Sequence, residues 1–339
     1  MRGLRPSDFG EDGGANFRRG LIRWYRREGR DLPWRRTSDA YAVLVSEFML
    51  QQTQVATVLP YYERWLKRFP DFATLARAEE SEVLHAWQGL GYYSRARHIH
   101  AAAKMVQQCH GGKLPADAAR IAKLPGVGRY TAGAIASFGF DQPEPIVDAN
   151  IARVLARLTN WRKPIDCAAG QAHLWRTATA LVPAVGARSF NSALMDLGAT
   201  ICLPRAPLCG RCPVRRFCQA KDPAILPVKR KKPATIRLTE CHAFSQERGR
   251  LLLEQSSERW RGMWILPRLD TPPVRPALLR LDFPFTHHRI TLAVFDRATA
   301  TTIGDRQKWF PVPALGQLPV PSPHRRALAQ LLPNDYRLS

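Results

Sequence analysis

The sequence predicts a mainly α-helical protein that is followed by a smaller α+β C-terminal domain. Apolar residues recur at helical spacing through the first two thirds of the chain, and no strand pattern interrupts them. Near residue 235 the pattern changes to the alternation that is typical of strands. A length of 339 residues is also long for one domain. We therefore expect a helical region at residues 1–221, a linker at 222–234 and an α+β domain at 235–339.

The chain carries a large positive charge. Its 51 Lys and Arg residues outnumber its 28 Asp and Glu residues and give a net charge of +23. A field of this sign attracts polyanions and makes binding to a phosphate backbone salt-dependent. The alternative is that arginine-rich helix faces are simply solvated, and composition does not separate the two. Residues 1–16 are polar and glycine-rich, and no run of about 18 apolar residues follows, so we expect a cytoplasmic protein without membrane contact.

Helical patterns account for most of the first 221 residues. The first runs from Phe17 to Tyr25 with Asn16 as its N-cap, and the second runs from Ala40 to about Gln54. Residues 30–36 separate these two helices as a basic and aromatic loop. Further helices are predicted at residues 79–87, 132–138, 151–158, 168–182 and 189–201.

One acidic residue stands alone in the second predicted helix. Glu47 is surrounded by the apolar residues between Tyr41 and Leu50. If Glu47 is buried, desolvation raises its pKa and lets it hold a proton near neutrality. The alternative is that Glu47 lies on an exposed stripe, as most helical glutamates do.

A short segment after residue 123 contains a candidate phosphate grip. Gly126 and Gly128 form a sharp turn before a helix that opens near Tyr130. Backbone N–H groups at such a helix N-terminus face outward and can hold a phosphate oxygen. The sequence therefore predicts a clamp for a nucleic-acid backbone here.

A second carboxylate follows this turn. Asp148 precedes the helix predicted at residues 151–158. One interpretation is that Asp148 or Asn150 only caps that helix. The other is that Asp148 has a chemical role, and the local sequence does not decide between these two interpretations.

The segment at residues 88–97 is a further candidate for nucleic-acid contact. It holds two glycines, two tyrosines and two arginines. Rings in a loop can stack on bases, and arginines can bind phosphates. Aromatic residues near loops are more often anchors of the core, so this pattern is weak by itself.

Four of the seven cysteines lie in the spacing C-x6-C-x2-C-x5-C. Prolines and a glycine force turns between them, so the four thiols are expected to share a metal. Four-cysteine ligation suits both zinc and an iron–sulfur cluster. The cysteines are Cys202, Cys209, Cys212 and Cys218.

Together these motifs resemble the helix-hairpin-helix DNA glycosylases that carry an iron–sulfur cluster, with the hairpin at about residues 114–139. Within that superfamily, the segments at 46–55, 89–93 and 147–150 are similar to the adenine DNA glycosylase family (MutY), which removes adenine mispaired with 8-oxoguanine. The resemblance extends over almost the whole chain. It implies the fold of that superfamily and a [4Fe-4S] cluster on the four cysteines at 202–218, with zinc as the second choice.

The resemblance also implies catalytic roles. Glu47 would be the general acid that protonates adenine, and Asp148 would be the carboxylate that stabilises the cationic sugar. Tyr130 stands where bifunctional relatives carry a lysine, so no Schiff base can form there. The implied enzyme is a monofunctional DNA glycosylase of base excision repair.

The implied DNA contacts surround these groups. Gln52 and Tyr92 would fill the stack that a flipped base leaves, and Trp34 and Arg35 would line the adenine pocket. The resemblance also implies DNA contacts by the two hairpin glycines and by one polar residue that follows Asp148. These residues are Gly126, Gly128 and Asn150.

Two positions depart from the family pattern. Ala149 replaces the glycine of an Asp-Gly-Asn stretch, which should change the turn slightly. Ser192 stands where some relatives have a longer polar residue near the pocket. Neither departure removes a catalytic group.

The C-terminal domain resembles the Nudix-like domain of the same family. Residues 236–244 and 251–253 are predicted to form a hairpin, and residues 292–295 form another strand. The stretch at 262–267 takes the place of the family's Gly-Leu-Trp-x-Phe-Pro, and no acidic Nudix hydrolase helix occurs. The domain is therefore expected to recognise DNA. Thr286 and His287 resemble the loop that contacts 8-oxoguanine.

The expected partner is duplex DNA with adenine opposite 8-oxoguanine or guanine, bound by a monomer in a bacterial-type cytoplasm, at the nucleoid. One rival function is a bifunctional glycosylase/lyase similar to endonuclease III, which Tyr130 disfavours. Another is a catalytically silent DNA-scanning protein that keeps the cluster. The presence of both Glu47 and Asp148 disfavours this second rival.

Overall fold

The computed structural model describes residues 13–231, 234–297 and 303–332. Most of the polar N-terminal segment falls on residues 1–12, outside the described residues, as do residues 232–233 of the expected linker. The chain divides into two compact units. The first comprises Met1–Ala73 and Ala101–Lys231, and the second comprises Thr74–His100 and Lys232–Ser339.

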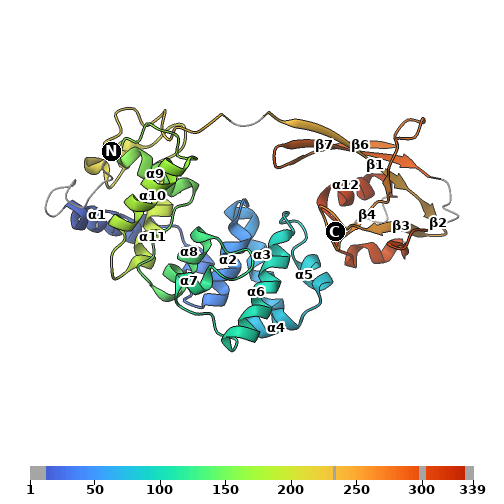
Figure 1. The fold of residues 1–339 in the computed structure, drawn as a ribbon, viewed down its shortest axis with the longest axis horizontal. Helices are drawn as coiled ribbons and strands as arrows, with labels where there is room; N and C mark the ends of the chain where they lie inside the picture. Colours follow the sequence, from blue (N-terminus) through green and yellow to red (C-terminus); the bar gives the residue numbers. More distant parts are fainter. Residues whose placement is uncertain (1–12, 232–233, 298–302, 333–339) are drawn as a thin grey trace. The chain divides into compact units, whose positions relative to one another are not determined.

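The first unit is built from helices (Figure 1). Its longer helices surround an apolar core, and short helical turns follow the last of them. The helices are α1 (Gly13–Glu28), η2 (Pro33–Arg35), α2 (Ala40–Leu50), α3 (Val55–Arg68), α7 (Ala118–Ile121), α8 (Arg129–Phe140), α9 (Ala149–Leu158), α10 (Ala168–Leu181), α11 (Ala187–Asp196), η3 (Leu197–Ile201), η4 (Cys209–Arg211) and η5 (Arg215–Phe217). Two more, α4 (Phe72–Arg77) and α6 (Ser94–His110), contribute residues to both units.

Several helix boundaries differ from the prediction, among them the start of α1 and the end of α2. Helix α1 begins at Gly13, so Asn16 is not its N-cap, and the Asn16 side chain instead accepts a hydrogen bond of 2.6 Å from Arg19. Helix α2 ends at Leu50 because Gln52 takes a left-handed φ of 56°, which no helix can continue. Helices α3 and α6 were not predicted.

The core of the first unit forms where amphipathic helices face one another. Phe17, Leu21 and Trp24 lie on one stripe of α1 and are buried. They belong to a cluster with apolar side chains of α8, α9, α10 and α11. This packing fixes the ends of α8, α9 and α11, which carry the polar groups described below.

The described residues of the second unit form two four-stranded sheets and several helices. One sheet has the order β5-β1-β7-β6, and its long strands β1 and β7 run parallel. In the other sheet β3 pairs with β2, β4 and β8. The elements are α5 (Glu80–Ala86), β1 (Ile236–Phe244), β2 (Gln246–Glu247), β3 (Arg250–Gln255), β4 (Trp264–Ile265), β5 (Arg268–Leu269), β6 (Leu279–Phe285), β7 (His288–Asp296), β8 (Gln307–Pro311), η6 (Val312–Gln317) and α12 (Ser322–Leu331). The α+β class of this region is confirmed.

The predicted hairpin between residues 236–244 and 251–253 is wrong in its pairing. The chain does turn at Arg248 and Gly249, which both have positive φ, but only β2 pairs with β3 across that turn. Strand β1 pairs along its full length with β7, from Ile236 opposite His288 to Phe244 opposite Asp296. The nine-residue parallel ladder therefore takes β1 into the other sheet.

Within the described ranges, no helix combines the length and apolar character that crossing a bilayer requires.

Two buried histidines pack together in the second unit. The rings of His242 and His324 lie 4.7 Å apart, edge to face, and the Leu266 N–H donates to His324 Nδ1 at 3.2 Å. The Nε2 atoms of both rings are buried and have no hydrogen-bond partner among the described residues. Burial lowers the pKa of His324 well below the usual 6.5, and burial also lowers the pKa of His242.

We therefore expect the second unit to lose stability as the pH falls. The histidines of the unfolded state take up protons below about pH 6.5, whereas the buried pair stays neutral. The free energy of unfolding therefore falls by up to about 1.4 kcal/mol per histidine for each pH unit. Amide hydrogen exchange of β1 and α12 at about pH 7.5 and about pH 5.5, corrected for intrinsic rates, measures it. The His287→Gln variant, altered at an exposed histidine, should keep the same dependence. Equal protection at the two pH values contradicts the expectation.

Candidate active site

A cavity of about 600 Å³ lies in the first unit. Its walls come from η2, α2, α8, α11 and the start of α9. Seven of the residues singled out from the sequence line it, together with both positions that depart from the family pattern. These residues are Trp34, Arg35, Glu47, Gln52, Tyr130, Asp148 and Asn150, with Ala149 and Ser192.

Glu47 is buried on α2 and only 4% exposed. All residues of this helix from Tyr41 to Met49 are buried, so the helix has no solvated stripe for the carboxyl group. Burial raises the pKa of Glu47 to about 7, and the charge of Asp148 adds to the rise. A hydrogen bond from Tyr130 and the charge of Arg35 act against it. Glu47 can thus carry a proton at neutral pH.

Asp148 is the N-cap of α9 and also faces the cavity. One carboxylate oxygen accepts from the Ile151 N–H at 2.6 Å, and the other accepts from the Asn150 side chain at 3.3 Å. Burial raises the pKa of Asp148, while these hydrogen bonds and the charge of Arg153 lower it. The capping role suggested by the local sequence is therefore real, and it orients the carboxylate.

Tyr130 lies in the first turn of α8 and reaches Glu47. Burial raises the pKa of Tyr130 well above 10, and the charges of Glu47 and Asp148 raise it further. The phenol therefore stays neutral and donates its hydrogen bond to Glu47. No amine is available at this position.

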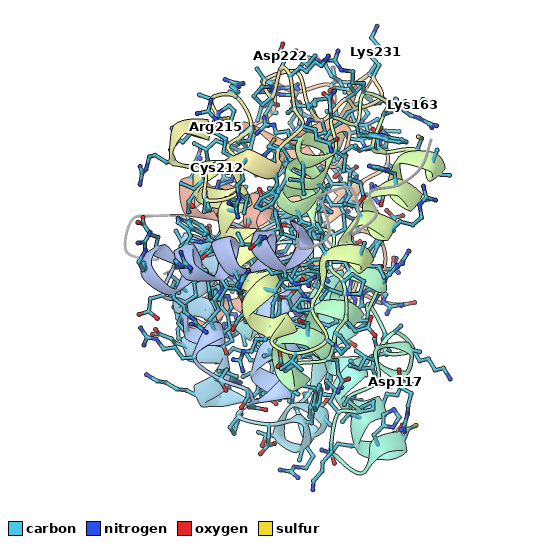
Figure 2. The ribbon with its side chains drawn as sticks, turned by 90° about the vertical axis from the view of Figure 1, so that its left-hand side faces the viewer. Asp117, Lys163, Cys212, Arg215, Asp222 and Lys231 are labelled. Atoms are coloured by element: carbon cyan, nitrogen blue, oxygen red, sulfur yellow. The ribbon has the colours of Figure 1, made fainter. Side chains whose placement is uncertain are left out.

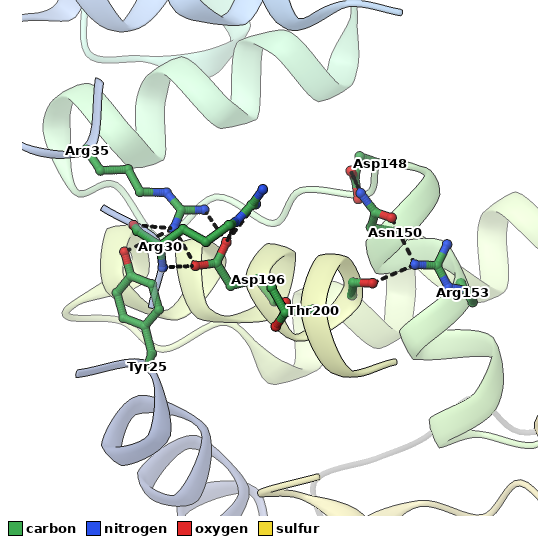
Figure 3. A network of polar contacts seen from close by, with 9 residues as sticks. Tyr25, Arg30, Arg35, Asp148, Asn150, Arg153, Asp196 and Thr200 are labelled. Atoms are coloured by element: carbon green, nitrogen blue, oxygen red, sulfur yellow. Dashed lines mark hydrogen bonds and ion pairs between the residues drawn. The ribbon is translucent and has the colours of Figure 1, made fainter. Parts of the chain in front are cut away.

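Asp196 is a buried acid that the sequence reasoning missed. Its side chain is fully buried, and it binds Arg35 through two hydrogen bonds of 2.7 and 2.8 Å. It also accepts from the Arg30 backbone N–H at 2.8 Å and lies 2.7 Å from the Arg30 guanidinium (Figure 3). The signal was present, because Asp196 is the single acid among apolar neighbours in α11, as Glu47 is in α2. The cavity wall also contains Arg188, which was not predicted.

The hairpin between α7 and α8 has the geometry of an anion grip. Gly126 takes a left-handed φ of 75°, and Gly128 is the N-cap of α8 without a side-chain cap. Both glycines are exposed. Arg129 follows directly, and its guanidinium lies 3.8 Å from the centre of the Trp175 ring. Free backbone N–H groups and an exposed cation thus share one surface.

Arg153 connects the start of α9 to the cysteine loop. It donates to the Asn150 side chain at 2.9 Å (Figure 3). It also donates to the Gly198 carbonyl at 2.6 Å and to the Cys202 carbonyl at 2.8 Å. Gly198 lies in the π-helix η3, and a Cβ added there would come within 2.8 Å of the Asn150 Cβ. A glycine is therefore required for η3 to approach Asn150 this closely.

The four cysteines of the loop line a common cavity of about 340 Å³. Figure 2 shows Cys212 and Arg215 on this loop. The buried Arg157 side chain donates to the Cys202 Sγ at 3.2 Å and to the carbonyls of Leu203 and Pro204. Burial raises the pKa of Cys212 to about 11, and nearby thiols raise it further. An all-sulfur donor set around a cavity of this size fits a metal–sulfide group that keeps the thiols ionised.

Among residues 13–231, 234–297 and 303–332, no three Cys, His, Asp or Glu side chains are arranged to hold one ion.

The remaining predicted residues belong to the second unit. Tyr92 is 42% exposed and has a left-handed φ of 46°. Thr286 and His287 form the exposed turn between β6 and β7, where Phe285 pairs with His288. Thr286 has a φ of 54°, which is rare for a β-branched residue.

Known proteins are similar to this chain in sequence and in fold. A family model described as HhH-GPD superfamily base excision DNA repair protein matches residues 45–177. The adenine DNA glycosylase of Rattus norvegicus is 48% identical over 213 residues, which are 60% of this chain and 41% of the rat protein. That of Buchnera aphidicola subsp. Schizaphis graminum is 34% identical over 257 residues, or 74% of each chain. The chain thus spans about two fifths of the mammalian relative and about three quarters of the bacterial one.

A solved structure gives the same result for the fold. The structure of a thermostable thymine-DNA glycosylase is 31% identical with a TM-score of 0.56, and the match covers 61% of this chain and 95% of that chain. The fold predicted for the helical region is confirmed.

Proposed function

The chain belongs to the adenine DNA glycosylase family, and we propose that it hydrolyses the N-glycosidic bond of adenine mispaired with 8-oxoguanine or guanine in duplex DNA. The observation that carries this proposal is a cavity with two carboxyl groups, of which Glu47 holds a proton near neutrality. Breaking a glycosidic bond requires both a proton donor and an anion beside the sugar. The DNA glycosylases among its relatives support the same reaction class.

The proton comes from Glu47 in this mechanism. Adenine is a poor leaving group until a ring nitrogen is protonated, so a carboxylic acid with a pKa of about 7 supplies the proton at physiological pH. The neutral phenol of Tyr130 holds Glu47 in place through its hydrogen bond. The buried residues of α2 around Glu47 desolvate the acid and so favour its protonated form.

The developing sugar cation is stabilised by Asp148. Its capping bond to Ile151 and its bond to Asn150 hold the carboxylate at the cavity wall before the reaction begins. A carboxylate fixed in this way stabilises oxocarbenium character without reorganisation. A water then completes hydrolysis and leaves an abasic site.

The target adenine must leave the duplex to reach this cavity. The hairpin at Gly126 and Gly128 would hold the phosphate backbone, and Trp34 and Arg35 would line the adenine pocket. Gln52 and Tyr92, both with left-handed backbones at turns, would fill the vacated stack. The net charge of +23 favours binding of DNA, because its phosphate backbone is a polyanion.

The cysteine loop would hold a [4Fe-4S] cluster through Cys202, Cys209, Cys212 and Cys218. When bound, the cluster supplies a rigid cross-link for a loop that otherwise has little regular structure. Arg153 and Arg157 fix the same loop to α9.

The β-rich region at residues 235–339 would act as a Nudix-like reader of the opposite base. 8-Oxoguanine differs from guanine by a ring N–H donor and a carbonyl acceptor. The exposed Thr286 hydroxyl, within 3.5 Å of the Nδ1 atoms of His287 and His288, can accept a hydrogen bond from that N–H.

We expect Glu47→Gln to retain duplex binding and to lower the single-turnover excision rate by roughly two to four powers of ten, because an amide cannot donate the proton. In the wild type, excision should fall as the pH rises through about 7, where Glu47 loses its proton. Glu63→Gln, on the exposed face of α3, is the matched control. Near-normal excision by Glu47→Gln would rule out the assignment.

We expect the product to be an intact abasic strand that breaks only after alkali, because Tyr130 offers no amine for a Schiff base. Borohydride should trap little enzyme on DNA, with a bifunctional glycosylase/lyase as the positive control. Efficient trapping of the wild type would transfer the function to the endonuclease III-like rival.

We expect purified protein to be brown, with broad visible absorbance from iron bound to thiolate and sulfide. Cys212→Ser should weaken this absorbance, whereas Cys109→Ser, at an exposed cysteine outside the loop, should leave it unchanged. Colourless protein with stoichiometric zinc, prepared anaerobically, would favour the zinc alternative.

We expect Thr286→Val to reduce the preference for 8-oxoguanine over guanine by about 0.5–1.5 kcal/mol, the value of one hydrogen bond. Excision opposite guanine should survive, because the catalytic cavity is unchanged. Thr291→Val on β7 makes the same chemical change away from the turn. Equal preference ratios for wild type and Thr286→Val at matched salt would show that this hydroxyl does not read the base.

A further inference from the structure

The cavity wall contains an arginine that should be a natural partner for Glu47. Arg35 lines the cavity together with Glu47, and its charge acts on that carboxyl group. A guanidinium pairs with a carboxylate through two parallel N–H groups, and an opposite charge at close range lowers a carboxyl pKa by about 1–3 units. A free Arg35 would therefore keep Glu47 ionised.

The Arg35 guanidinium is not free to pair with Glu47, because it is hydrogen-bonded to the carboxylate of Asp196. The two terminal nitrogens of Arg35 bind the two oxygens of Asp196 at 2.7 and 2.8 Å (Figure 3). One nitrogen also lies 3.4 Å from the Tyr25 hydroxyl and 3.5 Å from the Arg30 carbonyl. The Arg35 side chain is 13% exposed and the Asp196 side chain is 0% exposed, so solvent does not weaken the pair.

Asp196 also binds a second arginine, Arg30. The Arg30 Nε donates to it at 2.8 Å, and the Arg30 Nη2 lies 2.7 Å from the same oxygen. The backbone N–H of Arg30 donates to the other oxygen at 2.8 Å. Arg30 also lines the catalytic cavity. One buried carboxylate thus binds both arginines of this side of the cavity.

We propose that Asp196 is a positioning residue that holds Arg35 away from Glu47 and so lets Glu47 keep its catalytic proton at neutral pH. This proposal rests on the proposed role of Glu47 as the general acid. Asp196 does not touch the substrate in this scheme, because it is absent from the residues that line the cavity. It acts through Arg35.

The other groups around Glu47 are accounted for. Tyr130 of α8 donates a hydrogen bond to it, and Asp148 at the start of α9 contributes a like charge. Arg188 of α11 lines the cavity, but its guanidinium is bound to the backbone carbonyls of Arg35 and Thr37. Arg35 is therefore the cation whose partner decides how much positive charge reaches Glu47.

The test is the pH dependence of single-turnover excision on duplex DNA with adenine opposite 8-oxoguanine. In Asp196→Asn, Arg35 loses its anionic partner and turns to Glu47, so the fall in rate should move to lower pH by about one unit or more. The rate loss should then be about tenfold or more above neutrality and smaller in acid. Arg35→Gln added to Asp196→Asn should move the fall back toward the wild-type pH.

The matched control is Asp31→Asn, which removes a carboxylate from the exposed pair with Arg36 and changes the charge equally. It should leave the pH dependence unchanged. Asp196→Glu keeps the anion and should stay closest to wild type. Folding of each variant is checked by circular dichroism and thermal unfolding. If Asp196→Asn does not fold, the pH dependence of excision is compared between Arg35→Gln and the double variant Arg35→Gln/Asp196→Asn, which lacks the charges of both residues.

The outcomes separate this inference from the proposed function. If Glu47→Gln leaves the fall in rate where it is in the wild type, Glu47 is not the acid and the proposed function loses its donor. If Glu47→Gln abolishes the fall but Asp196→Asn does not move it, only the role of Asp196 is overturned. In the Arg35→Gln background, Asp196→Asn should have no further effect on the pH dependence. A shift there would show that Asp196 does not act through Arg35.

Discussion

The desolvation of Glu47 is the interaction on which the rest of the site depends. A rise of its pKa from 4.5 to about 7 corresponds to about 3 kcal/mol of preference for the neutral acid. A raised carboxyl pKa means that the associated stability is present below pH 4.5 and lost as the pH rises through about 7. At neutral pH the burial of Glu47 therefore lowers the free energy of unfolding of the helical unit. The apolar packing of α2 from Tyr41 to Met49 offsets it and also creates the proton donor.

Two buried arginines of the same unit form hydrogen bonds with the backbone of the cysteine loop. The backbone there is irregular, so its carbonyl groups are not paired within a regular helix or sheet. Arg157 donates to carbonyls at Leu203, Pro204 and Leu226, and Arg153 donates to those at Gly198 and Cys202. Five N–H donors per guanidinium make arginine suited to this task. The loop is thereby tied to α9, whose first turn carries the catalytic candidates.

Several site residues take their position from the end of a helix or from a turn. Asp148 caps α9, Gly128 begins α8, and Gln52 follows the last residue of α2 with a left-handed backbone. Thr286 occupies a left-handed turn between β6 and β7. Such positions present polar groups that a helix interior would hide. The ends of helices and the turns thus present side chains or N–H groups without added loops.

The sequence by itself determined the helical class, the hairpin turn and the cysteine loop, because these follow from local spacing. It also singled out Glu47 and Asp148 as candidates, but their catalytic roles came from the resemblance to a known family, since the local sequence left other readings open. Only the tertiary structure decided that Glu47 is buried and that Asp148 both caps α9 and faces the cavity. It also decided that β1 joins β7 instead of β3, and that Asp196 binds Arg35 from 161 positions away. The reason is physical: desolvation, strand partner and charge pairing depend on residues that are distant in the chain and become neighbours only when it folds.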